Sequence, residues 1–193
     1  MPLEQRQLHI GDVMIMKAKM KLSHFGIAFG QALFSHNHQN AGALSVHPAI
    51  YVGRGRVIEA TSGGLRERQA DGRWNVFRYR ERPVARRAMS MAISKLNHRT
   101  RDNDFGKYAH AKAVASLFHS SSLGNNSLQR LTGPEAGSRK YFCSEFVIQC
   151  YFEAAGGGVG NAPIRAGRVT SPKDMHARIN RDTRWTHVGF YEE

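Results

Sequence analysis

The sequence predicts a mixed fold of strands and helices in a single domain, residues 1–193. Two β-rich runs, residues 45–52 and 57–61, flank a glycine-containing turn and indicate a hairpin. A separate run, residues 141–158, places its apolar residues at helical spacing and ends in three glycines, which indicates a helix with one buried stripe. With 193 residues and 41% hydrophobic content, the chain is long enough for one sizeable core and too short for two.

Before the hairpin, residues 10–16 read as a turn that leads into a short buried strand. Residues 23–34 are typical of a helix capped by a serine, and the polar loop that follows contains His36 and His38. This histidine pair has no third ligand at a suitable spacing and the chain has no Cys-x-x-Cys motif, so we expect no metal site.

After the hairpin, the segment 62–73 is rich in turn-forming residues. The later sequence predicts a strand at 75–80, a helix that opens at Pro83, a helix at 108–118, a helix start at 171–174 and a last strand at 185–191.

The register of the hairpin decides which side chains share a face. A three-residue loop, residues 53–55, makes Val52 face Arg56 and leaves His47 and Glu59 as diagonal neighbours on one face. A two-residue loop places them on opposite faces, because a one-residue slip reverses every side chain. The placement of the loop glycines favours the three-residue loop.

The strong positive charge favours anionic partners. The chain has 28 Lys and Arg residues against 15 Asp and Glu, a net charge of +13, which suits nucleic acid, acidic lipid or a cell-wall polymer. The basic residues form no RNA-binding signature or zinc-finger pattern, so we expect no specific nucleic-acid partner.

The two cysteines and the N-terminal sequence indicate in which cellular compartment the protein is expected. Cys143 and Cys150 are seven residues apart on one predicted helix, about 10 Å by helix rise, so they are expected to be free thiols. The N-terminus lacks the pattern of a signal peptide, and no apolar run approaches the length of a membrane span. We expect a chain that is cytoplasmic as synthesised and has no transmembrane segment, with export by a signal-peptide-independent secretion system as the alternative.

Three residues supply the parts of a nucleophilic site. Cys143 lies at the first turn of its predicted helix, where unpaired N–H groups and the helix dipole favour the thiolate. His47 supplies a base and Glu59 a group that orients the imidazole. The alternative for Cys143 is a small buried apolar residue, as most unpaired cysteines are.

These residues lie in motifs that resemble a known family. The motifs are Ile-Gly-Asp-Val at 10–13, His47 followed by Ile-Tyr-Val-Gly at 50–53, Val-Ile-Glu-Ala at 57–60 and Tyr-Phe-Cys-Ser-Glu-Phe-Val at 141–147. Together they resemble the papain-like hydrolases of circularly permuted NlpC/P60 type, which include the YiiX-like bacterial proteins and the lecithin:retinol acyltransferase group. Pro48 departs from the pattern and lacks a ladder N–H, so we expect His47 at a strand start or sheet edge.

The resemblance implies an α+β fold, in which a small antiparallel sheet packs on the cysteine-bearing helix and flanking helices. It also implies catalysis by Cys143, His47 and Glu59 through a thioester, without a cofactor. The backbone N–H of Cys143 would bind the oxyanion, and Tyr108 is a candidate for lining the site.

The leading function is a cysteine amidase or endopeptidase that cleaves peptide bonds, with peptidoglycan as the favoured anionic substrate. Such an enzyme could be a secreted antibacterial effector, a toxin with an immunity or delivery protein as partner. One alternative is a lipid or thioester acyl hydrolase or acyltransferase with the same three residues. The other is a non-catalytic anion-binding module.

Overall fold

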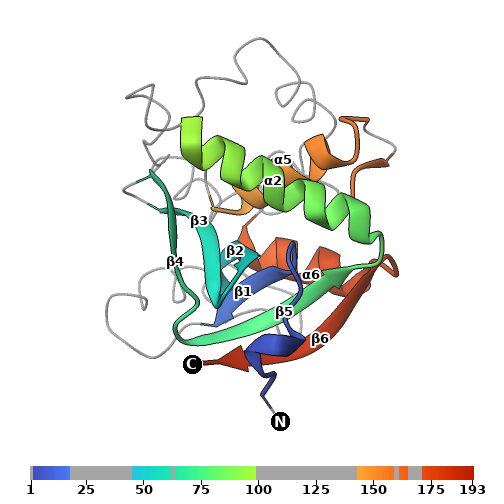
Figure 1. The fold of residues 1–193 in the computed structure, drawn as a ribbon. Helices are drawn as coiled ribbons and strands as arrows, with labels where there is room; N and C mark the ends of the chain where they lie inside the picture. The colour runs from blue at the N-terminus through green and yellow to red at the C-terminus, as the bar shows by residue number, and fades with distance from the viewer. Residues whose placement is uncertain (1, 18–44, 62–63, 99–142, 159–160, 165–170) are drawn as a thin grey trace.

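The computed structural model describes residues 2–17, 45–61, 64–98, 143–158, 161–164 and 171–193. Within these residues, an antiparallel sheet of six strands lies against three helices, so the predicted α+β class is confirmed (Figure 1). The strands are β1 (Val13–Lys17), β2 (Ser45–Gly53), β3 (Arg56–Thr61), β4 (Gly64–Gln69), β5 (Arg73–Tyr79) and β6 (Trp185–Glu192). The helices are α2 (Arg82–His98), α5 (Cys143–Ala154) and α6 (Pro172–Arg181), preceded by the short 3-10 helix η1 (Gln5–Gln7).

Most elements predicted from the sequence are present. The strands expected at 10–16, 75–80 and 185–191 correspond to β1, β5 and β6, and the helix expected from Pro83 is α2. At the start of α6 the hydroxyl of Ser171 accepts a hydrogen bond of 3.1 Å from the backbone N–H of Asp174, as its capping sequence predicts. The helices predicted at 23–34 and 108–118 lie outside the described residues.

The segment between the hairpin and β5 differs from its prediction. Residues 64–69 form β4, which pairs along its whole length with β3, whereas the sequence indicated only turns there. The segment has a single large apolar residue, Leu65, and its remaining side chains are polar or charged. An edge strand of this composition carries little hydrophobic signal, because its stability comes from pairing with a neighbour.

The strand order is β4-β3-β2-β1-β5-β6, which places β2 inside the sheet. His47 is the third residue of β2 and lies opposite Met16 of β1. The described pairs between β2 and β3 begin only at Ile50 and Ile58, beyond Pro48. Of the two positions expected from Pro48, a strand start or a sheet edge, the structure shows the strand start.

The two faces of the sheet pack against different cores. Val13, Ile15 and Ile50 belong to the core shared with α2, α5 and α6. The alternating positions, such as Ala49 and Val57, belong to a second core centred on Trp74. Because side chains alternate along a strand, His47 and Glu59 lie on the face of this second core.

The hairpin has the predicted register but not the predicted three-residue loop. The pairs Ile50↔Ile58 and Tyr51↔Val57 are those that a three-residue loop predicts, but Gly53 rather than Val52 lies opposite Arg56. The connection is a two-residue turn of Arg54 and Gly55, both with positive φ, 55° and 72°. An irregularity between Tyr51 and Gly53 inserts the extra residue and restores the register.

Helix α5 begins at Cys143 and ends at Ala154, as the glycine triplet predicts. Gly156 and Gly157 have positive φ, and the N–H of Gly157 donates to the carbonyl of Phe152 at 3.0 Å, which closes the helix. The helix is buried on nearly all sides rather than along one stripe, because it packs against both the sheet and α2 (Figure 1).

The C-terminal half of α5 is held by hydrogen bonds to α2 and to the turn before β1. Arg87 of α2 donates a hydrogen bond of 2.8 Å to the carbonyl of Ala154, where a cation complements the helix dipole. The hydroxyl of Tyr151 donates to the carbonyl of Gly11. A Cβ at Gly11 would lie 2.3 Å from the carbonyl oxygen of Ala85 in α2. The glycine of the Ile-Gly-Asp-Val motif therefore permits the close approach of this turn to α2.

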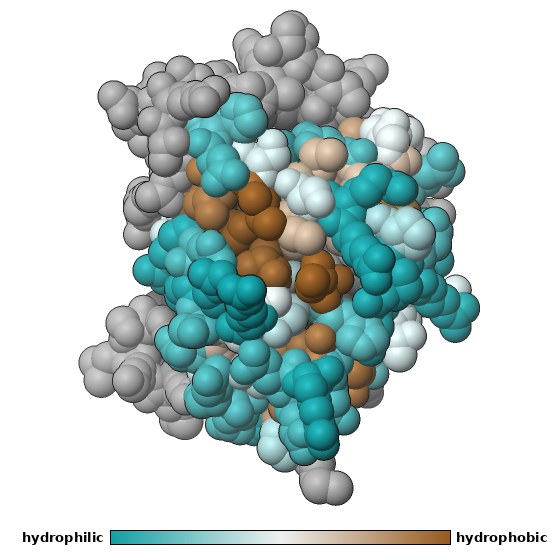
Figure 2. Space-filling view, in the orientation of Figure 1, coloured by the Kyte–Doolittle hydropathy of each residue, from teal (hydrophilic) through white to brown (hydrophobic). Residues whose placement is uncertain are grey.

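The surface seen from the helix side is largely hydrophilic, with an apolar area beside α2 (Figure 2). Of the large apolar side chains described, Ile10 and Ile93 are exposed. In the part of the chain that the structure describes, no helix combines the length and the apolar character needed to cross a membrane.

Candidate active site

The structure brings the three predicted site residues together from three elements. Cys143 is the first residue of α5, His47 lies near the start of β2, and Glu59 lies on the neighbouring strand β3. The thiol of Cys143 interacts with the imidazole of His47, which in turn contacts the carboxylate of Glu59. The chain order is therefore histidine, carboxylate, cysteine.

The contact between His47 and Glu59 joins Nε2 to Oε2 at 3.0 Å. The Glu59 side chain is fully buried, and the His47 side chain is 19% exposed. The contact is an ion pair between the imidazole ring and a buried carboxylate. Since Nε2 faces the carboxylate, Nδ1 is the ring nitrogen left for the thiol.

Burial lowers the pKa of His47, but its neighbours outweigh this effect. Hydrogen bonding and charge interaction with Cys143 and with Glu59 raise the pKa to about 9, from the usual 6.5. At neutral pH, a ring in this environment keeps its proton. A protonated imidazole beside a thiol is the arrangement that stabilises a thiolate.

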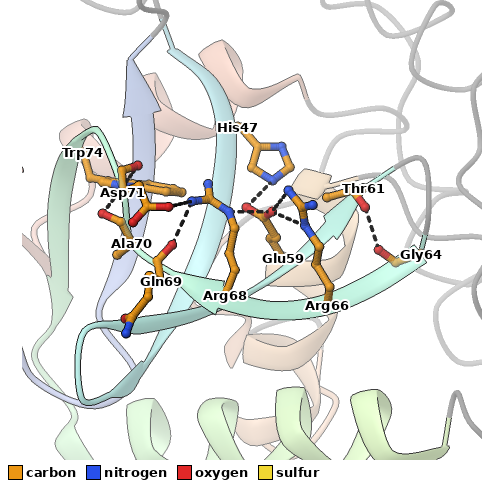
Figure 3. Close-up of polar contacts among 10 residues, drawn as sticks. All are labelled: His47, Glu59, Thr61, Gly64, Arg66, Arg68, Gln69, Ala70, Asp71 and Trp74. Carbon is orange, nitrogen blue, oxygen red and sulfur yellow. Dashed lines mark hydrogen bonds and ion pairs between the residues drawn. The ribbon is translucent and has the colours of Figure 1, made fainter. Parts of the chain in front are cut away.

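Two arginines of β4 hold the other oxygen of Glu59 (Figure 3). Its Oε1 accepts from Nε of Arg66 at 2.8 Å and from Nε of Arg68 at 2.8 Å, and Nη2 of Arg66 lies 2.7 Å away. Burial raises the pKa of Glu59, but the pairing with His47 and Arg68 outweighs it and lowers the pKa well below its usual range. Glu59 is therefore a permanent negative charge.

The two arginines follow from the strand pairing. Arg66 lies directly opposite Glu59 and Arg68 opposite Val57, so both share the face on which Glu59 lies. Sequence reasoning missed them because it assigned no strand to this segment. The one feature of strand period in this segment is the pair of basic residues at alternate positions, Arg66 and Arg68, with Glu67 between them, and it is a weak signal.

Cys150 has none of these neighbours. It is fully buried in the core shared by the sheet and the helices, and burial raises the pKa of its thiol far above the usual value. Both cysteines are free, as the sequence predicts.

The remaining candidates from the sequence, His36, His38 and Tyr108, lie outside the described residues. Among the residues that are described, no group of three His, Cys, Asp or Glu side chains is arranged to hold a metal ion.

Comparison with known proteins adds no relative. No family model matches the sequence, and no curated protein matches it.

Proposed function

We propose that the chain is a cysteine hydrolase that cleaves an amide bond through a thioester intermediate. Cys143 is the nucleophile, His47 the general base and acid, and Glu59 the residue that orients and charges the imidazole. The observation that supports this proposal is the convergence of a helix-terminal thiol, a partly exposed imidazole and a buried carboxylate.

The first half of the reaction forms the acyl-enzyme. In the resting pair the thiol proton is held on His47 as an imidazolium, and the thiolate sulfur of Cys143 attacks the acyl carbon to form a tetrahedral oxyanion. As the first residue of α5, Cys143 has a backbone N–H without a partner inside the helix, and this group donates to the oxyanion. The C–N bond then breaks while the imidazolium gives its proton to the departing amine, which leaves a thioester.

The second half regenerates the enzyme. Neutral His47 takes a proton from water, and the hydroxide adds to the thioester carbon. Collapse of this intermediate breaks the C–S bond and releases the carboxylic acid, which leaves the thiolate of Cys143 beside the imidazolium of His47, as at the start.

Glu59 acts through His47 and touches no reacting atom. Its Oε2 faces Nε2, so the ring presents Nδ1 to the thiol, and its charge stabilises the imidazolium formed in each half-reaction. The arginines that hold Oε1 prevent the carboxylate from rotating away.

We further propose that the fold is the permuted papain-like type. The supporting feature is the placement of His47 and Glu59 on strands that precede the helix bearing Cys143. The net charge of +13 favours an anionic substrate, and peptidoglycan combines amide bonds with anionic groups. An enzyme of this kind acting on a competitor's wall would be an antibacterial effector.

The deciding experiment supplies purified peptidoglycan and phospholipid vesicles in separate reactions and identifies released products by mass spectrometry. We expect new amines and carboxyl termini from peptidoglycan and no released fatty acid. Rapid acid quenching should also reveal an acyl adduct on the peptide that contains Cys143. Cys143→Ala is the matched control, and release of the same products by this variant would refute the thiol mechanism.

A further inference from the structure

The positive charge around Glu59 exceeds the single negative charge of its carboxylate. His47, Arg66 and Arg68 all contact this one carboxylate. The arginines and Glu59 together carry a net charge of +1 before the imidazole is counted. Arg68 also pairs with the carboxylate of Asp71, whose Oδ2 lies 3.9 Å from Nη1 and whose side chain is 74% exposed. Solvent therefore weakens its contribution.

The two arginines differ in how firmly they are held. Arg68 is 21% exposed, donates at 2.8 Å to the carbonyl of Gln69, and lies 5.2 Å above the ring of Trp74. The Arg66 side chain is 55% exposed, and within the described part of the chain its polar contacts all go to Glu59. Arg68 is therefore fixed by several groups besides Glu59, whereas the guanidinium of Arg66 is more exposed.

Arg66 and His47 contact the same carboxylate, that of Glu59. Figure 3 shows the guanidinium of Arg66 next to the Glu59 carboxylate, whose other oxygen contacts the ring of His47. Glu67, the neighbouring carboxylate on β4, points to the opposite face and pairs with Arg56 at 3.1 Å. It does not neutralise Arg66.

We propose that Arg66 is an anion-binding residue beside the nucleophile, which selects acyl substrates that carry a carboxylate or other negative group near the scissile bond. This inference rests on the proposed function. Its guanidinium can keep one N–H on Glu59 and turn the others to a substrate anion, since arginine has five donors in a planar fork.

The test compares two alkylating reagents of nearly the same shape, anionic iodoacetate and neutral iodoacetamide. Their rates of reaction with Cys143 are measured by peptide mass spectrometry in the full chain, and their ratio reports the local electrostatic potential. A change in thiol reactivity affects both reagents and cancels in the ratio. We expect Arg66→Gln to lower the iodoacetate-to-iodoacetamide ratio roughly two- to fivefold at low ionic strength, the effect of one charge at close range.

Two variants make the result specific. Arg66→Lys keeps the charge and should keep the ratio, and it also provides a folded comparison if the glutamine variant is unstable. Arg56→Gln removes an arginine of the opposite face that is 45% exposed, and should leave the ratio unchanged. An unchanged ratio in Arg66→Gln overturns the inference while leaving the proposed function intact. A Cys143 that neither reagent modifies in the natural chain overturns both.

Discussion

The two cysteines of α5 share a helix and a degree of burial but differ in their chemistry. Cys143 is 1% exposed and Cys150 is 0% exposed, so burial does not distinguish them. Cys143 lies at the helix start beside His47, and the His47 pKa is raised to about 9 in part by this contact. Cys150 lies two turns further on among apolar side chains, and burial raises its pKa.

This difference teaches that the neighbours of a buried thiol decide its role. A thiolate is stable only where a positive charge and backbone donors replace the water it has lost. The first turn of α5 offers both, whereas at Cys150 the charge of Lys95 is paired with Glu153 and does not offset the effect of burial. The following experiments test this contrast, in order of the size of the expected effect.

Replacement of each thiol should separate activity from packing. We expect Cys143→Ala to lower turnover by at least about 10⁴-fold, because no other group can form the thioester. Cys150→Ala should retain activity and lose stability of the order of 1 kcal/mol through a small cavity. Turnover on the best substrate and urea denaturation measure the two effects. A Cys143→Ala enzyme with measurable turnover would remove the distinction between the thiols.

Replacement of Glu59 tests how the imidazole beside Cys143 is controlled. We expect Glu59→Gln to lower kcat/KM by roughly 10²- to 10⁴-fold, because the amide cannot stabilise the imidazolium by charge. The KM should change less than kcat.

Loss of Glu59 also leaves two arginines without their carboxylate, so reduced stability must be separated from reduced catalysis. Glu67→Gln is the matched control, since Glu67 lies on the adjacent strand and pairs with Arg56 on the other face. A thermal melt of each variant accompanies the kinetics. If folded Glu59→Gln turns over at nearly the natural rate while His47→Ala is inactive, another residue orients the ring.

Alkylation compares the two thiols within a single molecule. We expect iodoacetamide to modify Cys143 about 100-fold faster than Cys150 near neutral pH, because Cys143 has an imidazole partner at a helix start, whereas burial raises the pKa of Cys150 despite the nearby charge of Lys95. His47, which contacts Cys143, has a side chain that is 19% exposed, so solvent reaches the immediate neighbour of the thiol. Peptide mapping at several times gives both rates. Equal labelling in the folded chain would show that the helix start does not activate its cysteine.

The pH profile should show the titration of His47. Because Cys143 and Glu59 raise the pKa of this ring to about 9, it loses its proton as the pH rises through that value. We expect kcat/KM to fall about tenfold per unit above pH 9, since no acid then remains to protonate the leaving amine.

The histidine pKa can also be measured without substrate, by NMR of the labelled ring. In Cys143→Ala the pKa of His47 should fall, because one of the two partners that raise it has gone, whereas in Cys150→Ala it should not move. An identical His47 titration in all three proteins would contradict the contact with Cys143.

The sequence predicted the local parts of this site well. The glycine triplet and the apolar spacing predicted where α5 ends and that it starts near Cys143. The serine-proline-aspartate start of α6 and the β-rich runs of the hairpin were equally local signals, because caps, turns and periodicity act over a few residues.

The tertiary structure decided how those parts meet. The two-residue turn at Arg54 and Gly55 would have separated His47 from Glu59, and only the irregularity after Tyr51 restores their common face. The strand β4, with Arg66 and Arg68, exists because β3 offers it a pairing edge, which no local pattern encodes strongly. Registry and edge pairing depend on contacts between strands, so the charge around Glu59 was set by the assembled sheet rather than by the sequence of any one segment.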